Sequence, residues 1–317
     1  MRLLVTGAAG FVGSNLVDHL LADGHEVVGY DNLSTGQLEF LAGATANGRF
    51  RLARGDILDR AALTAALAGC DAVFHFAANA DVRFGTERTR VDLDQNVVGT
   101  WNVLESMRAA GVRRILMAST GAIYGDTTVY PTPENAPFPI QTSLYSASKL
   151  AAEAYIQAYA EGFGIQGVIF RLVSILGERY SHGHVFDFLR QLRAHPERIE
   201  VLGNGQQRKS YLYVADCVRA MSLALAKASG RVEIFNLGTD EVACVDDSIS
   251  WIAEYLGLAP RRVYQGGERG WVGDNPLIVL DCTRIKALGW APRHSIREGV
   301  ERTVAFLQEN LWLLERR

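Results

Sequence analysis

The strongest constraint on the fold lies at the start of the chain, in residues 1–31. Arg2–Thr6 is an apolar run typical of a buried strand, and it leads straight into a turn with three glycines. Apolar residues at helical spacing follow in Asn15–Ala22, and Glu26–Tyr30 has the composition of a second strand. A strand, a helix and a strand in close succession form a βαβ unit, whose two strands lie parallel in one sheet. The sequence therefore predicts an α/β protein with a parallel sheet.

The glycine turn, Gly7-x-x-Gly10-x-x-Gly13, also predicts a ligand. Glycines let the backbone approach a pyrophosphate, which lies on the N–H groups at the positive end of the following helix. Asp31 follows the second strand, where a carboxylate can accept hydrogen bonds from the ribose of adenosine. Because its negative charge repels a 2′-phosphate, the pattern favours NAD over NADP. Glycines alone are common in tight turns, so the prediction depends on the strand, the helix and the acid around them.

A second feature is the pair Tyr145 and Lys149, four residues apart in the predicted helix Ser143–Gly162. At this spacing both side chains share one helix face. A phenol has a pKa of about 10 and is a poor base at neutral pH, but a nearby ammonium favours the phenolate. Such a pair can take a proton from a sugar or alcohol hydroxyl while a neighbouring group accepts hydride. The pair also occurs by chance on many helices, so its weight comes from the rest of the chain.

Together, the glycine spacing and Tyr145-x-x-x-Lys149 resemble the short-chain dehydrogenase/reductase superfamily. The length and the C-terminal half are similar to its extended branch, the nucleotide-sugar epimerases and dehydratases, and the resemblance runs from Met1 to about Leu307. It implies a Rossmann-like, doubly wound parallel sheet with a smaller C-terminal substrate-binding lobe. Residues 1–173 are expected to form the NAD-binding domain and residues 174–317 mainly the lobe, with residues 210–240 or so returning to the first domain.

The resemblance also implies a cofactor-binding set. Asp56 and Ile57 resemble the pair that holds the adenine, although Asp56 is equally suited to cap a turn or the predicted helix Asp59–Leu67. Asn96 is either the family's buried structural asparagine or a surface amide. His75, inside an apolar run, is expected to be a core histidine. The full set expected around NAD is Gly7, Gly10, Phe11, Val12, Gly13, Asp31, Asn32, Asp56, Ile57, Ala77, Ala78, Asn96, Ser119, Tyr145 and Lys149.

The segment Ser119–Gly125 resembles the active-site turn of this family, at the end of the predicted strand Val112–Ala118. Thr120 takes the position of the hydroxyl that bonds the reacting sugar oxygen, so Thr120, Tyr145 and Lys149 are the expected catalytic residues. The family's 4,6-dehydratases carry Asp-Glu directly after this hydroxyl, and its decarboxylases carry Glu. This chain has the neutral pair Gly121-Ala122. That pair leaves oxidation and re-reduction at C4 of the sugar, which is epimerisation.

The expected substrate residues depart from the family pattern. Ser174 replaces an asparagine that binds the diphosphate, and Lys209, beside Arg208, replaces an arginine. Trp271 replaces a second phosphate-binding arginine, for which Arg269 either substitutes or serves as a rim residue. Val201 lies in a segment resembling the one whose backbone reads uracil. Arg83 and Arg179 either meet a phosphate or sugar carboxylate or are solvated.

The resemblance implies a UDP-sugar 4-epimerase, with UDP-glucose and UDP-galactose as the first substrate pair. A UDP-glucuronate or UDP-N-acetylhexosamine 4-epimerase and a reductase of nucleotide-linked keto sugars remain open alternatives. A sensor that binds NAD without chemistry is an alternative from another class. Such proteins typically lose the tyrosine or the lysine, and this chain keeps both.

Composition argues against several other classes. The net charge of -3 gives no electrostatic case for nucleic acid or an anionic membrane. Four scattered cysteines lack metal-ligand spacing, so no metal is expected, and they indicate buried thiols in a reducing compartment. Met1 leads straight into a strand, and no apolar run is long enough to span a bilayer. We expect a cytoplasmic protein that forms homodimers through helical surfaces in Asp92–Ala110 and Ser143–Gly162.

Overall fold

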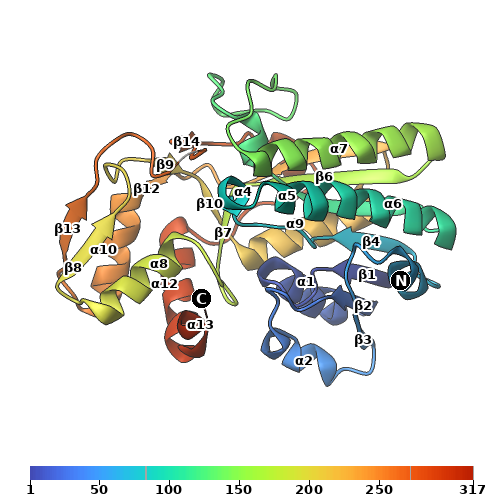
Figure 1. Cartoon of the computed structure of the whole chain (residues 1–317), viewed down its shortest axis with the longest axis horizontal. Coiled ribbons are helices and arrows are strands. Elements are labelled where there is room, and N and C mark those ends of the chain that lie inside the picture. The colour runs from blue at the N-terminus through green and yellow to red at the C-terminus, as the bar shows by residue number, and fades with distance from the viewer. Residues whose placement is uncertain (83, 272, 317) are drawn as a thin grey trace.

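The structure, a computed structural model, describes residues 1–82, 84–271 and 273–316. Within these residues the main feature is a seven-stranded sheet of order β11-β6-β5-β4-β1-β2-β3 (Figure 1). All neighbouring strands run parallel, and the order proceeds outward in both directions from the β1–β4 boundary. The predicted doubly wound α/β fold is confirmed. The strands are β1 (Arg2–Thr6), β2 (Glu26–Asp31), β3 (Phe50–Arg54), β4 (Ala72–His75), β5 (Arg114–Thr120), β6 (Gln166–Leu172) and β11 (Val232–Leu237).

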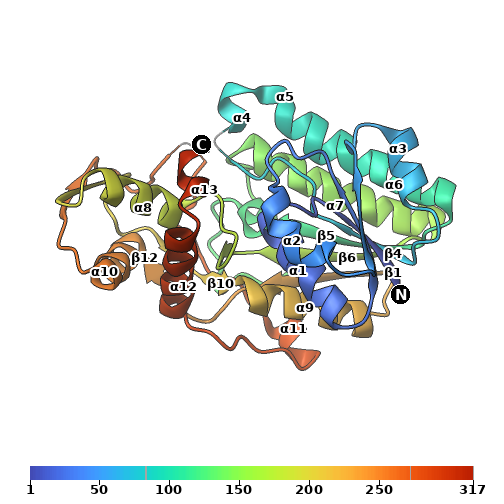
Figure 2. The same ribbon diagram turned by 90° about the horizontal axis from the view of Figure 1, so that it is seen from below.

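Helices cover both faces of this sheet (Figure 2). α1 (Phe11–Ala22) and α9 (Val214–Lys227) contribute buried apolar residues to a core on one face. α3 (Arg60–Ala66), α6 (Gly99–Ala110) and α7 (Leu144–Phe163) share a second core on the other face. Because both faces of the sheet are covered, its central strands are continuous apolar runs rather than alternating ones.

The helix predicted over Asp92–Ala110 is broken into three pieces. It consists of α5 (Thr89–Asp92), the π-helical turn η2 (Leu93–Val98) and α6. Widened turns of this kind are frequent at functional sites, and this one carries Asn96. The remaining short helices of this half are η1 (Leu38–Leu41), α2 (Ala42–Thr45), α4 (Phe84–Glu87) and η3 (Gly121–Tyr124).

A smaller lobe, on the left in Figure 1, follows β6 and has its own hydrophobic core. Its helices are α8 (His184–Ala194), α10 (Val245–Leu256), α12 (Ile296–Glu309) and α13 (Trp312–Glu315). The short strands and the remaining helix after β6 are β7 (Ser174–Leu176), β8 (Arg198–Val201), β9 (Arg208–Lys209), β10 (Tyr211–Tyr213), β12 (Ala243–Cys244), β13 (Arg261–Tyr264), β14 (Leu277–Ile278) and α11 (Thr283–Ala287).

Residues 214–237 leave the lobe and rejoin the sheet. α9 packs beside α1, and β11 pairs with β6 along its whole length. The expected boundary at residue 173 falls between β6 and β7, and as a division into domains it stays a prediction.

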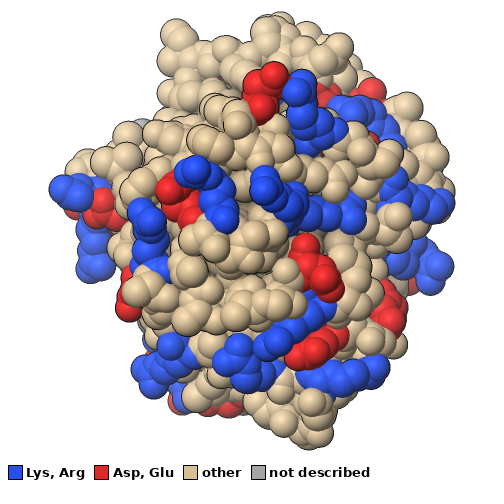
Figure 3. Space-filling model, turned by 90° about the vertical axis from the view of Figure 1, so that its right-hand side faces the viewer, with Lys and Arg blue, Asp and Glu red and all other residues tan. Residues whose placement is uncertain are grey.

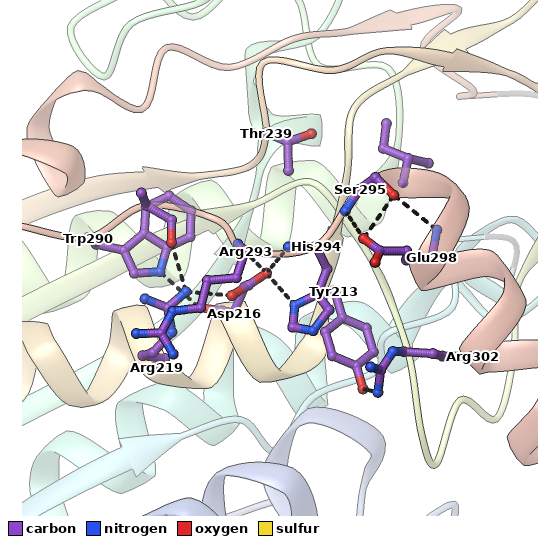
Figure 4. Close-up of polar contacts among 12 residues, drawn as sticks. Tyr213, Asp216, Arg219, Thr239, Trp290, Arg293, His294, Ser295, Glu298 and Arg302 are labelled. Carbon is purple, nitrogen blue, oxygen red and sulfur yellow. Dashed lines mark hydrogen bonds and ion pairs between the residues drawn. The ribbon is translucent and has the colours of Figure 1, made fainter.

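Asp216, in the first turn of α9, ties residues 290–294 to this returning segment (Figure 4). Its carboxylate accepts hydrogen bonds from the backbone N–H groups of Arg293 (2.9 Å) and His294 (3.1 Å) and forms an ion pair with Arg219. Burial opposes ionisation, but these bonds together lower the pKa of Asp216. The backbone carbonyl of Asp216 also accepts a hydrogen bond from Nε1 of the buried Trp290 (3.0 Å). A charged carboxylate therefore holds the lobe and the sheet together.

The molecular surface and the cysteines fit the composition. Figure 3 shows basic and acidic side chains interspersed over one face of the molecule. Cys70, Cys217 and Cys282 are unpaired and buried as predicted, whereas Cys244, the N-cap residue of α10, is half-buried. In the described part of the chain, no helix combines the length and the apolar character needed to cross a bilayer, and no cluster of metal-binding side chains occurs.

Candidate active site

The predicted catalytic residues lie together where α7 faces the carboxyl end of β5. Ser143 caps α7 by accepting a hydrogen bond from the Ser146 N–H (3.1 Å), so the helix starts immediately before Tyr145. The Tyr145 hydroxyl lies beside Thr120, close enough for the threonine hydroxyl to lower the pKa of the phenol. One turn further along α7, the buried Lys149 donates from Nζ to the carbonyl oxygen of Ala118 (3.0 Å). The structure thus brings a phenol, a hydroxyl and an ammonium to one strand end.

Burial dominates the ionisation of this pair. It raises the pKa of Tyr145 to about 12, although the hydrogen bond with Thr120 lowers it. Burial also lowers the pKa of Lys149 to about 8, against the carboxylates of Glu153 and Asp92, which raise it. The expectation that Lys149 brings the Tyr145 pKa towards neutrality is therefore not met in the chain by itself. A positive charge beside the phenol would lower its pKa.

The glycine turn between β1 and α1 has the shape of a cofactor cradle. A Cβ on Gly7, whose φ is +70°, would lie 2.7 Å from the backbone nitrogen of Ala77, and one on Gly13 would collide with the Gly7 carbonyl. α1 starts at Phe11, earlier than predicted, and no side chain caps it. The N–H groups of its first turn, at residues 11–13, are therefore available to an anionic group. Ala78, beyond Ala77, is half-buried at the end of the neighbouring strand.

Acidic and amide side chains gather beyond β2 and β3, where the adenosine is expected. Asp31 is buried and accepts hydrogen bonds from the N–H groups of Ala9 (2.9 Å) and Leu33 (2.8 Å), one on each oxygen. Burial raises its pKa, and these two bonds oppose that rise. Each oxygen keeps a second lone pair for a ribose hydroxyl. Asn32 donates from Nδ2 to Asp56 Oδ2 (2.9 Å). Asp31, Asn32 and Asp56, which are all predicted to surround NAD, therefore lie together.

Asp56 and Ile57 both form hydrogen bonds within the protein. Asp56 accepts a hydrogen bond from the Leu58 N–H (2.9 Å) and so caps a turn, whereas Asp59 caps helix α3. The side chain of Ile57 is buried in the core beneath α3 and α6. The carbonyl of Ile57 accepts a hydrogen bond from Asn102 Nδ2 (3.0 Å), so contacts within the protein fix the position of Ile57.

Asn96 and His75 are both buried. Asn96 donates from Nδ2 to the Ser148 hydroxyl on α7 (2.9 Å) and accepts from the Asn79 N–H (2.8 Å). Asn96 is therefore a buried structural asparagine, and the alternative of a surface amide is wrong. His75 bonds the hydroxyls of Thr6 and Thr100, and burial, followed by the charge of Lys149, lowers its pKa to about 3. The prediction of a neutral core histidine is confirmed.

Two of the predicted substrate cations lie in one cluster in the lobe. The Lys209 ammonium is ion-paired with the buried carboxylate of Asp274 and lies 4.9 Å from the ring centre of Trp271. Arg269 donates to the Asp274 carbonyl (2.8 Å) and pairs with Asp126. Lys209 and Arg269 are therefore already engaged with acidic partners, and a diphosphate would share them.

The other predicted substrate residues are not brought together. Arg179 forms an ion pair with Asp18 on α1, in place of the expected carboxylate of a sugar. Arg208 and Ser174 are exposed, on β9 and β7. Val201 is buried in the lobe core, and its carbonyl accepts a hydrogen bond from the Gln265 N–H (3.0 Å). Arg83 lies outside the described residues.

Sequence reasoning missed two buried carboxylates beside the catalytic pair. Glu153 lies on α7, four residues beyond Lys149, and accepts a hydrogen bond from Ser119, whose hydroxyl was expected at the cofactor. Helical spacing from Tyr145 and Lys149 was the signal that could have found it. Asp92 on α5, whose Oδ2 has no hydrogen-bond partner among the described residues, acts electrostatically on both members of the pair. No sequence pattern pointed to it.

The parallel sheet carries a glycine cradle after β1 and a Tyr–Lys pair beside the end of β5. This arrangement defines a site like that of oxidoreductases that use a nucleotide cofactor. Residues 3–238 match the model of the NAD dependent epimerase/dehydratase family, and the chain belongs to that family. A UDP-glucose 4-epimerase of Mycolicibacterium smegmatis is 36% identical over 97% of this chain and 99% of its own.

Solved structures agree with this assignment. The crystal structure of a UDP-galactose 4-epimerase is 40% identical, with a TM-score of 0.88 over 98% of this chain and 100% of its own. A UDP-glucose 4-epimerase of Thermotoga maritima, solved with UDP-glucose, is 32% identical with a TM-score of 0.87 and the same coverage.

Proposed function

We propose that this chain is an NAD-dependent UDP-sugar 4-epimerase that interconverts UDP-glucose and UDP-galactose. The observation that carries the proposal is the Tyr145 hydroxyl against Thr120, followed by a position with no acid. A Cβ on Gly121 would lie 3.2 Å from a methyl group of Leu280, so this position has little space for a side chain. Without an acid there, elimination and decarboxylation lack a proton-transfer group, and reversible oxidation at C4 remains.

Each catalytic side chain has one task in this proposal. When bound, NAD would supply the chemistry of hydride transfer from and back to C4 of the sugar. Tyr145 takes the proton of the sugar 4-hydroxyl and later gives it back to the same oxygen. Thr120 bonds that oxygen and orients it. Lys149 keeps an ammonium one helix turn from Tyr145, bonded to the end of β5.

The residues of the lobe favour a substrate in which a neutral sugar is attached to a diphosphate. Lys209 is the proposed diphosphate ligand, because its ammonium has three donors and Asp274 takes one. Arg269 is the proposed second ligand, with Ser174 and Arg208 at the rim. The ion pair of Arg179 with Asp18 removes one of the two cations considered for the carboxylate of a glucuronate. This favours glucose and galactose over uronic acids.

The test is to incubate the purified protein with UDP-galactose, without added cofactor, and to follow the anomeric protons by NMR. Growth of UDP-glucose to a stable mixture is the expected result. No conversion would rule out this substrate pair, and UDP-glucuronate and UDP-N-acetylglucosamine would then be tried in the same way. Stoichiometric consumption of NADH with keto sugars would replace the epimerase proposal by a reductase.

Asp31 gives a second test, on cofactor choice. Asp31→Asn keeps the size of the side chain but removes the charge, and its NH2 group replaces one of the two oxygens that accept the N–H groups of Ala9 and Leu33. Affinity for NAD should therefore fall about 10-fold to 100-fold. The preference for NAD over NADP should weaken, because the repulsion of a 2′-phosphate is lost. Titration calorimetry with both cofactors measures the two effects. Asp71→Asn, at an exposed position before β4, is the matched control and should bind both as the parent does.

Two further parts of the proposal concern assembly and location. We infer a homodimer through α6 and α7, supported by the exposed side chains of Trp101 (38%) and Tyr155 (43%) on these helices. Light scattering of the pure protein gives the mass that decides between one copy and two. We infer a cytoplasmic location because the four cysteines are unpaired, as in a reducing compartment.

A further inference from the structure

Three side chains on one face of α7 meet three successive residues of β5. Tyr145, Lys149 and Glu153 are spaced four residues apart, so they lie one helix turn after another. Their partners are the hydroxyl of Thr120, the carbonyl of Ala118 and the hydroxyl of Ser119, in that order along the helix. The position of α7 along β5 is thus fixed at three points, and the first two are the proposed catalytic residues.

Glu153 is the most strongly held of the three. It is fully buried, and its carboxylate accepts hydrogen bonds from Ser119 Oγ (2.5 Å), Arg171 Nε (3.1 Å) and Arg171 Nη2 (2.8 Å). Ser119 belongs to β5 and Arg171 to β6, so one carboxylate joins α7 to two neighbouring strands of the sheet. A buried ion pair with this many hydrogen bonds has a defined geometry, and breaking one partner leaves an uncompensated charge.

Arg171 extends this connection to the active-site turn. Its Nη1 donates to the Tyr124 hydroxyl (2.7 Å) at the end of η3 and to the Glu134 carbonyl (2.8 Å). The Tyr124 hydroxyl in turn donates to Asn236 Oδ1 on β11 (2.9 Å). Thr120 begins this same η3 turn, because its Oγ1 accepts the Ala122 N–H (3.1 Å). The network therefore holds both sides of the Tyr145–Thr120 contact.

The charges around Lys149 give Glu153 a second effect. Glu153 on α7 and Asp92 on α5 are the carboxylates that act on the Lys149 ammonium. His75 on β4 faces it and is neutral, the Tyr145 phenol precedes it on α7, and the Arg171 guanidinium on β6 is bonded to Glu153. Removing the negative charge of Glu153 leaves Asp92 as the counter-ion among these groups.

We propose that Glu153 is a positioning residue for the proposed 4-epimerase, which fixes Tyr145 and Lys149 against β5 through Ser119 and Arg171 and places a carboxylate one helix turn from the Lys149 ammonium. The reaction itself rests on the proposed function, but the placement and the charge of Lys149 do not. They are properties of the protein that can be measured without a sugar substrate. Nothing in the chemistry requires Glu153 to touch the substrate or the cofactor.

The first experiment is an NMR titration of the lysine side chains. The chain has four lysines, Lys149, Lys209, Lys227 and Lys286, so labelling of lysine with 13C gives few signals, and Lys149→Met assigns one of them. In the parent protein Lys149 should titrate with a midpoint of about 8. In Glu153→Gln the ammonium has lost an adjacent anion, so the midpoint should move about one pH unit lower. Glu161→Gln, at an exposed position on the same helix, is the matched control and should leave it unchanged.

Two more variants separate position from charge and guard against misfolding. Ser119→Ala keeps the charge of Glu153 and its pair with Arg171 but removes the bond to β5. It should fold, leave the lysine midpoint in place and lower kcat about tenfold, with KM nearly unchanged. Glu153→Gln combined with Arg171→Met replaces the ion pair by neutral groups and should recover much of the thermal stability lost in Glu153→Gln. Its lysine midpoint should nevertheless stay low.

Each outcome bears on one part of the proposal. A low lysine midpoint in both Glu153 variants, with reduced kcat in Ser119→Ala, supports the proposal. A parental midpoint in the folded double variant would overturn the effect on charge, and parental kcat in Ser119→Ala would overturn the effect on position. If no epimerisation is found at all, the lysine titration still tests whether Glu153 keeps Lys149 charged. Failure of the proposed function is then distinct from failure of this inference.

Discussion

Tyr145→Phe should lower epimerase turnover by about 10³-fold or more, while the protein keeps its bound NAD. The variant loses the hydroxyl that lies against Thr120 and that is the proposed proton-transfer group. The aromatic ring remains, so the packing of α7 against β5 and the glycine cradle on α1 should be unaffected. Turnover is measured by NMR with UDP-galactose, and bound cofactor by chromatography after denaturation of the purified protein.

The matched control is Tyr155→Phe, which removes a hydroxyl from an exposed tyrosine of the same helix. Its turnover should equal that of the parent. Near-normal activity of Tyr145→Phe would exclude Tyr145 as the proton-transferring group. Loss of NAD together with activity would instead mean that the phenol is needed for cofactor binding, and the chemical role would have no support from this variant.

Gly13→Ala should abolish stable NAD binding and destabilise the fold by about 1–3 kcal/mol. Glycine-to-alanine changes inside helices normally stabilise by about 0.5–1 kcal/mol, so the expected sign is reversed. The reason is steric, because the new Cβ would collide with the carbonyl of Gly7 and force the turn between β1 and α1 to open. Thermal unfolding and the cofactor content of the purified variant measure the two effects.

Gly162→Ala on α7 provides the opposite case for comparison. A Cβ there meets no atom within 4 Å, so the ordinary helix preference should apply and stability should rise by about 0.5–1 kcal/mol. Both variants add one methyl group to a helix, and only the cradle differs between them. If Gly13→Ala kept NAD and gained stability, the glycine turn would not be the tight cradle that the structure describes.

The sequence was sufficient to predict the sheet and the grouping of the proposed catalytic residues, because both depend on local patterns. The glycine turn and the strand ends predict the βαβ unit, and the helical spacing of Tyr145 and Lys149 predicts a shared face. Thr120 was placed by the resemblance of its turn. The structure then brings these three together, as expected.

Other features depend on partners far apart in the chain, and these could not be predicted. The π-helical turn carries Asn96, whose side chain bonds Asn79 and Ser148, the latter on another helix. Arg179 looked available for a substrate until the fold placed Asp18 beside it. The high pKa of Tyr145 results from burial, which no sequence motif expresses. Tertiary contacts and desolvation therefore account for the differences.

The late return of β11 to the sheet has a consequence for how the chain is made. During synthesis β6 emerges well before β11, its neighbour, and until then presents an open row of backbone hydrogen-bonding groups. A nascent chain that stops there would expose an unpaired strand edge to other chains. The last strand of the sheet follows β7, α8, β8, β9 and β10 in the chain, so the sheet is complete only after this part of the lobe has been synthesised.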